Sequence, residues 1–408
     1  MTNRTPELLC PAGDRERFDA ALRFGADAVY LGATSFGMRA APQNFTFPAL
    51  AEAVQTAHKQ GVKVYLTCNT LPRNDEISAL PAFLESAADC GVDAFIVADF
   101  GVLSLCKQYA EKVPVHISTQ AGVVNYVTAQ QFYNLGAQRI VTARELSLSD
   151  IAEIRAKTSK ALEIECFVHG AMCVSFSGRC LLSNYLLNRD ANRGACAQPC
   201  RWEYALMEKN REGQYFPIGE DETGTYILNS KDMCMIEHIP EIVAAGIDSF
   251  KIEGRAKSAY YTAVITNAYR AAIDGYLENP SPDYKVAPWI AEEPRKVSYR
   301  EYCTGFYFGA PNTDANISYE GGYRREWDVC AVVKGSDGET IFAEQRNKFC
   351  VGDTLELLER GKPPVQFTVE ELENENGEAI EACPHPTMQL RIKSTLCPTA
   401  GALLRKQA

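Results

Sequence analysis

The sequence lacks the features of an exported or membrane-spanning protein. In its 408 residues, no apolar run approaches the roughly 20 residues that a transmembrane helix needs. The first residues, MTNRTPELLCPAGD, have neither a basic start before an apolar core nor an Arg-rich amphipathic pattern. We therefore expect a cytoplasmic protein, whose 46% apolar residues supply the core of one large and one smaller domain.

Histidines are few, and the common hydrolase motifs are missing. Among five histidines, His238 has no second histidine at the spacing of an H-E-x-x-H zinc site. No G-x-S-x-G turn occurs, and no serine or cysteine is assigned to a histidine by sequence. No G-x-G-x-x-G turn follows the first expected strand, which argues against a dinucleotide-binding fold. Hydrolysis therefore has no positive support from motifs.

The formal charge of −11 shows that an excess of positive charge is also missing. Such a chain is not expected to adhere non-specifically to nucleic acid or to an anionic membrane. A local basic patch can still bind RNA. The candidates are the Tyr- and Arg-rich stretch 297–325, with Arg324 and Arg325, and the pair Arg346 and Lys348. The stretch is equally well explained as an extended segment around the main domain.

Cysteine, in contrast, is abundant and unevenly distributed. The count of 15 is odd, and the chain has too large a core to need a disulfide framework, so a reduced compartment is expected. Most cysteines stand singly in apolar stretches, where the thiol acts as a small hydrophobic group; they include Cys10, Cys68, Cys90, Cys106 and Cys166.

Four further cysteines gather in one segment, ECFVHGAMCVSFSGRCLLSNYLLNRDANRGACAQPC, at 165–200. Cys173 and Cys180 are seven residues apart and Cys196 and Cys200 are four apart, so each pair can share a helical face. Four thiolates can hold an iron–sulfur cluster or zinc, and the six residues within the first pair favour iron–sulfur. Cys234 is a candidate substitute for one of the four. Four unrelated buried thiols remain the alternative.

Alternating strands and helices predict a (β/α)8, TIM-like barrel. The helical stretches between strands have apolar residues at helical spacing, and three of them end at glycine. Repetition of this unit indicates a parallel sheet. Nine strands are expected for eight barrel positions, so one lies outside or in an insertion. They cover 7–13, 27–32, 63–69, 94–99, 115–120, 139–143, 163–170, 226–233 and 248–255.

Active sites of such barrels lie at the carboxyl ends of the strands. The polar residues expected there are Asp14, Asn69, Asp99, Gln120, Arg144, Glu145, His169, Lys231, Asp232, Lys251, Glu253 and Arg255. Each is equally well explained as an ordinary loop residue.

The domain boundaries follow from the places where the repeat stops. Residues 1–280 form the barrel, with an insertion at about 170–225 that contains a β-hairpin around NREG. Residues 281–325 are read as a linker and extended segment, because the run 279–296 is rich in Pro and charge and reads as a linker. Residues 326–408 alternate about turns such as G-S-D-G and predict a small β-barrel domain.

The cysteine segment resembles the signature of the peptidase U32 (collagenase-like) family. Similar motifs recur along the chain as ELLCPAG, GADAVYLG, NRGACAQPCR, ILNSKD, DSFKIEGR and EQRNKFCVGD. The resemblance is strongest to the branch that hydroxylates tRNA uridine at carbon 5 with prephenate as hydroxyl donor. It implies a 4Fe-4S cluster held by Cys173, Cys180, Cys196 and Cys200, with zinc as the weaker alternative. A U32-type peptidase, a peptide-binding protein and a structural metal module remain alternatives.

The resemblance also directs attention to particular side chains. Prephenate carries two carboxylates, which planar guanidinium groups bind well. Arg179, Arg201 and Arg255 are predicted to bind substrate, and His169, Lys251 and Glu253 to be catalytic. Ion pairs of Lys251 and Arg255 with Glu165 or Glu253 are the competing explanation. The expected partners are tRNA, the small dicarboxylate and either a second subunit or further copies of this chain.

Overall fold

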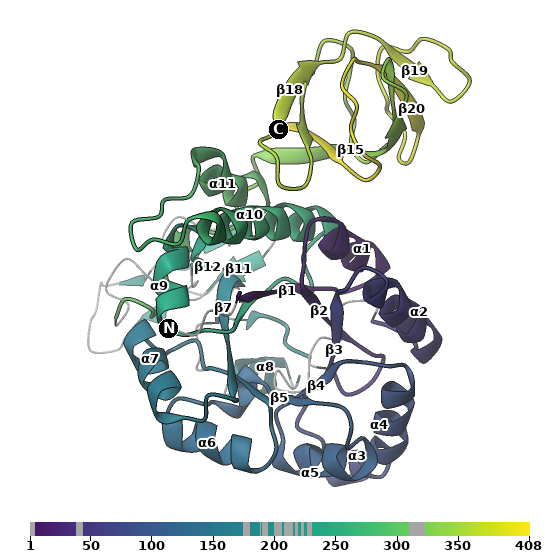
Figure 1. Cartoon of the computed structure of the whole chain (residues 1–408). Helices are drawn as coiled ribbons and strands as arrows, with labels where there is room; N and C mark the ends of the chain where they lie inside the picture. The colour runs from purple at the N-terminus through teal and green to yellow at the C-terminus, as the bar shows by residue number, and fades with distance from the viewer. Residues whose placement is uncertain are drawn as a thin grey trace.

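The computed structural model describes residues 5–37, 44–173, 180–187, 189, 195–199, 206–207, 215–216, 219–221, 224–226, 231–309 and 323–408. Figure 1 shows a barrel of strands surrounded by helices, with a separate β-domain beside it. None of the described helices is both long enough and apolar enough to cross a membrane.

Eight parallel strands close the barrel, as the sequence predicts. β1 to β7 pair in chain order, and β13 closes the ring by pairing with both β1 and β7. The inner strands are almost wholly buried, which explains why they read as continuous apolar runs. The strands are β1 (Glu7–Pro11), β2 (Ala28–Gly32), β3 (Lys63–Cys68), β4 (Ala94–Val97), β5 (Val115–Ile117), β6 (Arg139–Val141), β7 (Glu163–Ala171) and β13 (Ser249–Ile252).

The ninth expected strand lies outside the barrel. β12 (Asp232–Cys234) runs antiparallel to the end of β7, with Asp232 opposite Ala171 and Cys234 opposite His169. β14 (Tyr302–Cys303) pairs in parallel with its other edge. The chain therefore leaves β7 and returns to it along one strand pair.

Helices cover the outside of the barrel in the order that the apolar spacing predicts. Asp14 caps α1 by accepting from the Arg17 N–H, and Ser258 caps α10 by accepting from the Tyr261 N–H. The outer helices are α1 (Arg15–Arg23), α2 (Phe47–His58), α3 (Asn74–Ile77), α4 (Leu80–Asp89), α5 (Phe100–Tyr109), α6 (Tyr126–Asn134), α7 (Leu148–Lys157), α9 (Ile239–Ala244) and α10 (Ala259–Glu278). Two 3-10 turns, η1 (Thr119–Ala121) and η4 (Ile236–His238), add to these.

A chain of ion pairs crosses the barrel interior. Arg139 donates to Glu7 at 2.6 Å and to Glu165 at 3.0 Å, and Lys251 donates to the other Glu165 oxygen at 2.6 Å. Tyr65 adds a hydrogen bond to Glu7 at 2.6 Å. Because every lone charge here has a partner, the buried groups satisfy one another.

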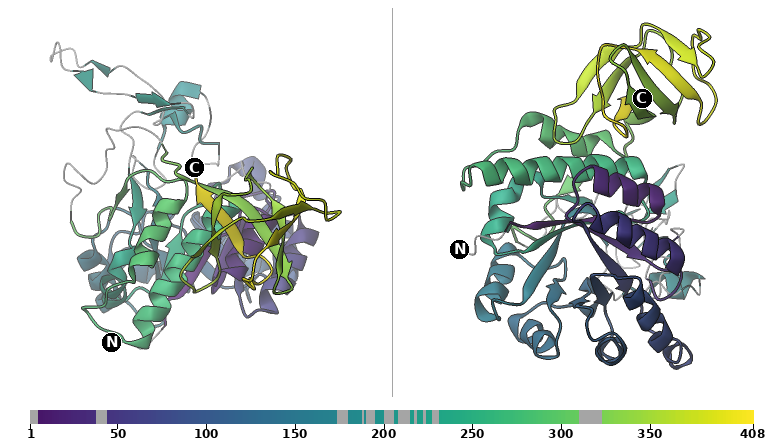
Figure 2. Two further views of the ribbon diagram at one scale, coloured as in Figure 1. Left: turned by 90° about the horizontal axis from the view of Figure 1, so that it is seen from above. Right: turned by 45° about the vertical axis from the view of Figure 1, so that its right-hand side comes forward.

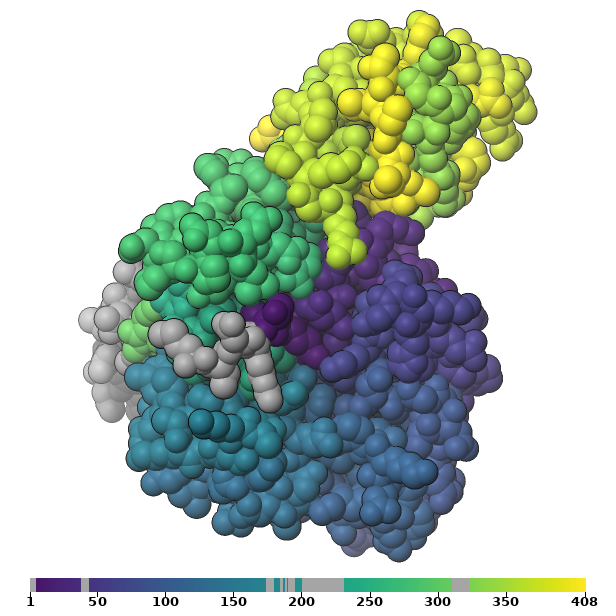
Figure 3. Space-filling model, viewed as in Figure 1, coloured from purple at the N-terminus to yellow at the C-terminus, as the bar shows by residue number. Residues whose placement is uncertain are grey.

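The stretch expected to be a linker contains packed helical turns. α11 (Pro288–Glu292) and η5 (Glu293–Lys296) lie against α10. η5 carries Glu293, which is fully buried and accepts from Arg405 at 2.5 and 2.8 Å. Arg405 also donates to Glu356 at 2.6 Å. The C-terminal domain is thus bound to the barrel by buried charges, and Figure 3 shows it as a lobe on one side of the barrel.

The C-terminal domain is an antiparallel sheet that curls into a half-barrel. Seven strands pair in the order β18-β17-β21-β15-β16-β20-β19 around a separate apolar core. The predicted β-structure around the G-S-D-G turn corresponds to β15 and β16. The strands are β15 (Trp327–Ser336), β16 (Thr340–Gln345), β17 (Thr354–Leu358), β18 (Val365–Thr368), β19 (Leu372–Asn374), β20 (Gln389–Lys393) and β21 (Leu403–Gln407).

The insertion after β7 is described in part. It contains the short helix α8 (Leu182–Leu187) and two small antiparallel strand pairs. β8 (Leu206–Met207) pairs with β9 (Tyr215–Phe216), so the strands that flank the predicted NREG hairpin are present, although NREG itself lies outside the described residues. β10 (Gly219–Asp221) and β11 (Gly224–Tyr226) form the second pair.

Candidate active site

The insertion leaves the barrel at the carboxyl ends of its strands. β7 ends at Ala171, two residues before Cys173. The left view of Figure 2 shows α8 and the short strands β8 to β11 projecting from the barrel on the side away from the chain's N-terminus. Since the N-terminus leads directly into β1, this side is the carboxyl face, where barrel enzymes hold their active sites.

Three of the four predicted ligand cysteines are described. Cys173 and Cys196 are exposed, Cys180 is half-buried, and none forms a disulfide. The Cys196 sulfur accepts from the Gln198 N–H at 3.4 Å and from the Ser183 hydroxyl at 3.9 Å. Cysteine sulfurs of this kind are the usual ligands of an iron–sulfur cluster.

The grouping of these thiols stays a prediction. Cys200 lies outside the described residues. Among the residues that are described, no three His, Cys, Asp or Glu side chains are arranged to hold a metal ion.

Cys234, the proposed substitute ligand, has a different environment. It lies on β12 opposite His169, on the barrel side of Ala171, whereas Cys173 follows Ala171. Its side chain is half-buried, as is that of Cys180. Cys200 and Cys234 therefore both stay predicted candidates for the fourth ligand position.

Four of the five scattered cysteines named above are packed as the sequence predicts. Cys10, Cys68, Cys106 and Cys166 are fully or almost fully buried, whereas Cys90 is half-buried. Burial raises the pKa of the Cys10, Cys106 and Cys166 thiols to about 12. These thiols are unreactive at neutral pH.

His169, a predicted catalytic residue, lies at the end of β7 among phenol rings. Its Nδ1 is 3.4 Å from the Tyr269 hydroxyl and its Nε2 is 3.5 Å from the Tyr302 hydroxyl. Burial lowers its pKa to about 3, so the ring is neutral at pH 7. This environment suits a packed imidazole better than a group that carries protons near neutral pH.

Lys251, the second predicted catalytic residue, belongs to the ion-pair chain inside the barrel. Its ammonium is 2.6 Å from Glu165 and 4.6 Å from the centroid of the Tyr30 ring. The side chain is 5% exposed. The structure therefore shows the ion pair with Glu165 that was the competing explanation.

Glu253, the third predicted catalytic residue, lies at the rim itself. One of its carboxylate oxygens accepts from the Tyr30 hydroxyl at 3.2 Å and is 4.0 Å from the Arg144 guanidinium. Arg144 also donates to the Ala171 carbonyl at 2.7 Å and lies over the Phe167 ring, with 3.9 Å from Cζ to the ring centroid. Sequence reasoning counted Arg144 only among the polar strand ends. Its position directly after β6 was the available signal.

Of the predicted substrate-binding arginines, Arg255 alone is described. It is 3% exposed and donates to Thr67 at 3.1 Å and to Asn44 at 2.6 Å. It thus approaches β3 from β13 across the mouth of the barrel. Arg179 and Arg201 lie outside the described residues.

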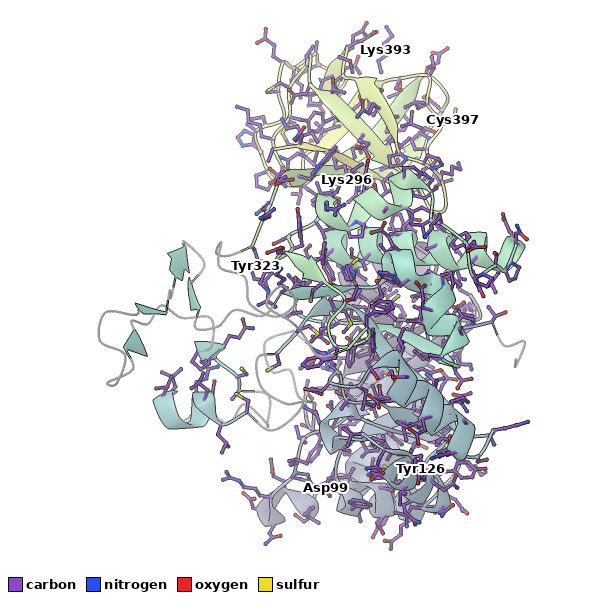
Figure 4. The ribbon with its side chains drawn as sticks, turned by 90° about the vertical axis from the view of Figure 1, so that its left-hand side faces the viewer. Asp99, Tyr126, Lys296, Tyr323, Lys393 and Cys397 are labelled. Carbon is purple, nitrogen blue, oxygen red and sulfur yellow. The ribbon has the colours of Figure 1, made fainter. Side chains whose placement is uncertain are left out.

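Sequence reasoning missed a pocket beside this rim. About 520 Å³ in volume, it lies between the barrel rim and the start of the C-terminal domain. We call it the junction groove; the lining residues that matter below are Gln198, Glu253, Lys257, Tyr261, Tyr323 and Trp327. Figure 4 places Tyr323 between the barrel and the C-terminal domain, on the side from which the insertion projects.

Lys257 is the cation of the junction groove. Its ammonium donates to the Ser298 carbonyl at 3.2 Å and lies 3.8 Å from the centroid of the Tyr323 ring. Burial lowers its pKa. Its position two residues after Arg255, in the loop that follows β13, was a signal in the sequence.

The cations proposed for an RNA surface have mixed environments. Arg346 pairs with Glu344 and lies 3.6 Å from Glu16, so it joins the C-terminal domain to α1. Arg325 pairs with Asp328 at 2.7 Å, yet its side chain remains 65% exposed. Arg325 is thus better placed than Arg346 to contact another molecule.

The barrel and the C-terminal domain each match a known family model. Residues 13–317 match peptidase family U32, and residues 325–405 match the peptidase family U32 C-terminal domain. A Bacillus subtilis protein named tRNA hydroxylation protein P1 is 36% identical over 395 residues, which cover 96% of this chain and 93% of the relative.

Two further relatives align over nearly the whole chain. The Escherichia coli protein named tRNA hydroxylation protein P is 35% identical over 421 residues, covering 93% of this chain and 91% of the relative. A Porphyromonas gingivalis protein named collagenase is 32% identical over 408 residues, covering 96% of both chains. From these matches, the chain belongs to peptidase family U32.

Proposed function

We propose that this protein is a tRNA hydroxylase that forms 5-hydroxyuridine at the wobble position, with prephenate as the hydroxyl donor. The observation that carries the proposal is the alignment with two proteins named for tRNA hydroxylation over 93% or more of this chain. That span includes the cysteine segment, the rim and the C-terminal domain. A relative that shared only the barrel would support the fold alone.

A 4Fe-4S cluster is the cofactor that we propose for this reaction. Cys173, Cys180, Cys196 and Cys200 would hold it, since the three described thiols are accessible and outside any disulfide. Such a cluster supplies one-electron transfer when it is bound. Its place beside the barrel rim would bring that chemistry next to Glu253 and Arg144.

The rim residues of this chain supply binding and proton transfer. Arg144 and Arg255 are the guanidinium groups at the barrel mouth, and we assign them to the two carboxylates of the small acid. Glu253, oriented by Tyr30 and Arg144, is placed to accept the proton that leaves carbon 5 of uracil. Lys251 and His169 stabilise the strands that carry this site, through their buried contacts with Glu165 and Tyr269.

Two measurements test the proposal. Mass spectrometry of tRNA nucleosides from a deletion strain should show loss of 5-hydroxyuridine and its derivatives, restored by the gene on a plasmid. Protein purified without oxygen should be brown and contain four irons and four sulfides per chain. Unchanged nucleosides in a strain without a second copy, or a colourless protein with stoichiometric zinc, would each remove the proposal.

A peptidase is the second candidate, since one relative is named collagenase. Within the described residues, however, the hydrogen bonds of His169, His58 and His238 go to tyrosine or acidic side chains, with no serine or cysteine among these partners. A nucleophile and base pair is therefore missing from that part of the site. Cleavage of denatured collagen by iron-free protein would support the peptidase.

A further inference from the structure

Among the described residues, the junction groove contains a cation that pairs with no carboxylate. Lys257 lines the groove, and its ammonium is hydrogen-bonded to the Ser298 carbonyl and to the Tyr323 side chain. The nearby carboxylate of Asp232 pairs with Arg300 at 2.7 Å. A partly buried ammonium whose hydrogen-bond partners are neutral is stabilised by an incoming anion.

The walls of the groove favour a nucleotide over a small dicarboxylic acid. Tyr261, Tyr323 and Trp327 supply ring surfaces, and aromatic walls beside one cation are typical of sites for single-stranded nucleic acid. The small dicarboxylate is already assigned to Arg144 and Arg255 at the barrel mouth, which leaves the groove for a different anion.

The lining of the groove fits an RNA strand. It includes Glu253 from the rim and Gln198, which lies two residues after Cys196. It also includes Arg325 from the start of the C-terminal domain, and Arg324, the preceding residue, is exposed. A strand lying along the groove would therefore join an exposed basic surface to the proposed reaction site.

We propose that the junction groove binds the tRNA strand beside the nucleotide that is modified, with the Lys257 ammonium contacting a backbone phosphate. The proposal rests on the proposed function for the identity of the RNA. It adds that the C-terminal domain forms one wall of the RNA site through Tyr323, Arg325 and Trp327.

The test uses anaerobically purified full-length protein and tRNA from the deletion strain. Lys257→Met should weaken binding about tenfold in fluorescence anisotropy and reduce the slope of log Kd against log salt by about one. Lys257→Arg keeps the charge and should retain most of the affinity. Lys160→Met removes an exposed lysine before the amino end of β7 and should bind like the wild type.

A second pair of variants covers the case in which Lys257→Met fails to fold. Ala256 is exposed and lines the groove, so a larger side chain there is tolerated by the fold. Ala256→Glu should weaken tRNA binding about tenfold, because it places a carboxylate where the phosphate is expected. Ala256→Gln has the same shape without charge and should change binding less than threefold.

The outcomes separate this proposal from the proposed function. If wild-type protein binds tRNA yet forms no hydroxylated nucleoside, the proposed function is contradicted. The tRNA affinities of the variants then still test the role of the groove. Normal tRNA affinity in both Lys257→Met and Ala256→Glu overturns the groove, even if hydroxylation proceeds. Variants that bind tRNA normally and raise only the KM for prephenate would assign the groove to the small acid and overturn the proposal as well.

Discussion

Arg405, in the last strand of the C-terminal domain, donates to both carboxylate oxygens of Glu293, in the turn beside α10, at 2.5 and 2.8 Å. Both side chains are fully buried, and Arg405 lies 5.5 Å from the centroid of the Trp327 ring. Trp327 also lines the junction groove. The ion pair therefore fixes the position of one wall of the proposed RNA site.

Breaking this pair should destabilise the protein strongly. Arg405→Met leaves Glu293 and Glu356 buried with fewer partners, and the expected loss is about 3–5 kcal/mol in the free energy of unfolding. Urea unfolding measures it. Lys393→Met is the matched control, because its pair with Glu371 is exposed and should contribute under about 1 kcal/mol. Equal losses in the two variants would contradict the role of burial.

Lys251 should act through stability rather than chemistry. Lys251→Met removes a partner of the fully buried Glu165, so we expect a loss of about 3 kcal/mol in unfolding free energy. The hydroxylation rate of the remaining folded protein should stay within about threefold of the wild type. A fall in kcat of a hundredfold or more in folded Lys251→Met would show direct contact with substrate instead.

His169 should make the protein less stable in mild acid. Its pKa is about 3 in the fold and about 6.5 in the unfolded chain, so below pH 6.5 the unfolded state binds a proton that the folded state does not. Stability should therefore fall by up to about 1.4 kcal/mol per pH unit between roughly pH 6 and 4. His169→Gln should reduce this slope in thermal unfolding, and buried His116, whose pKa is also lowered, should account for part of what remains.

Replacing a cluster cysteine and replacing Cys234 should have different effects on the iron content of the protein. Serine at Cys173, Cys180, Cys196 or Cys200 should abolish the colour and most of the iron, because serine does not replace a thiolate ligand well. The assignment of Cys200 as the fourth ligand predicts that Cys234→Ser retains its iron. Full iron in Cys200→Ser with loss in Cys234→Ser would reverse the ligand assignment.

Arg144 should contribute to binding of the small acid. Arg144→Gln removes a guanidinium at the barrel mouth and should raise the KM for prephenate about 10- to 100-fold. Arg144→Lys keeps the charge but loses the planar fork, so an intermediate value is expected. Arg391→Gln, on the exposed side of the C-terminal domain, is the control. An unchanged KM in Arg144→Gln would remove Arg144 from the site.

The barrel was predictable from sequence because its signals are local. The apolar runs of β1 to β7 and the helical spacing between them identify each unit without knowledge of the others. The site was harder, because its side chains depend on pairings between distant residues. Lys251 lies in β13 and Arg255 follows that strand, yet Lys251 bonds Glu165 inside the barrel and Arg255 bonds Asn44 across the mouth.

The junction groove was beyond sequence reasoning for a related reason. It exists only where the loop after β13 meets the start of β15, and those segments are about 70 residues apart in the chain. The reading of 279–296 as a linker hid the contact, since buried Glu293 cannot be distinguished from an exposed glutamate by composition. A segment rich in proline and charge can be buried and packed when its carboxylate pairs with an arginine from a distant part of the chain.

The pairing of Asp232 with Ala171 makes the insertion a closed loop on a fixed stem. Once two chain ends are held side by side, doubling the length of the loop between them costs only about 0.6 kcal/mol in closure entropy. The barrel can therefore tolerate exchange or lengthening of this whole segment with little change in its own folding. New substrate specificities can therefore arise by replacement of the insertion between β7 and β12, while the eight strands of the barrel stay the same.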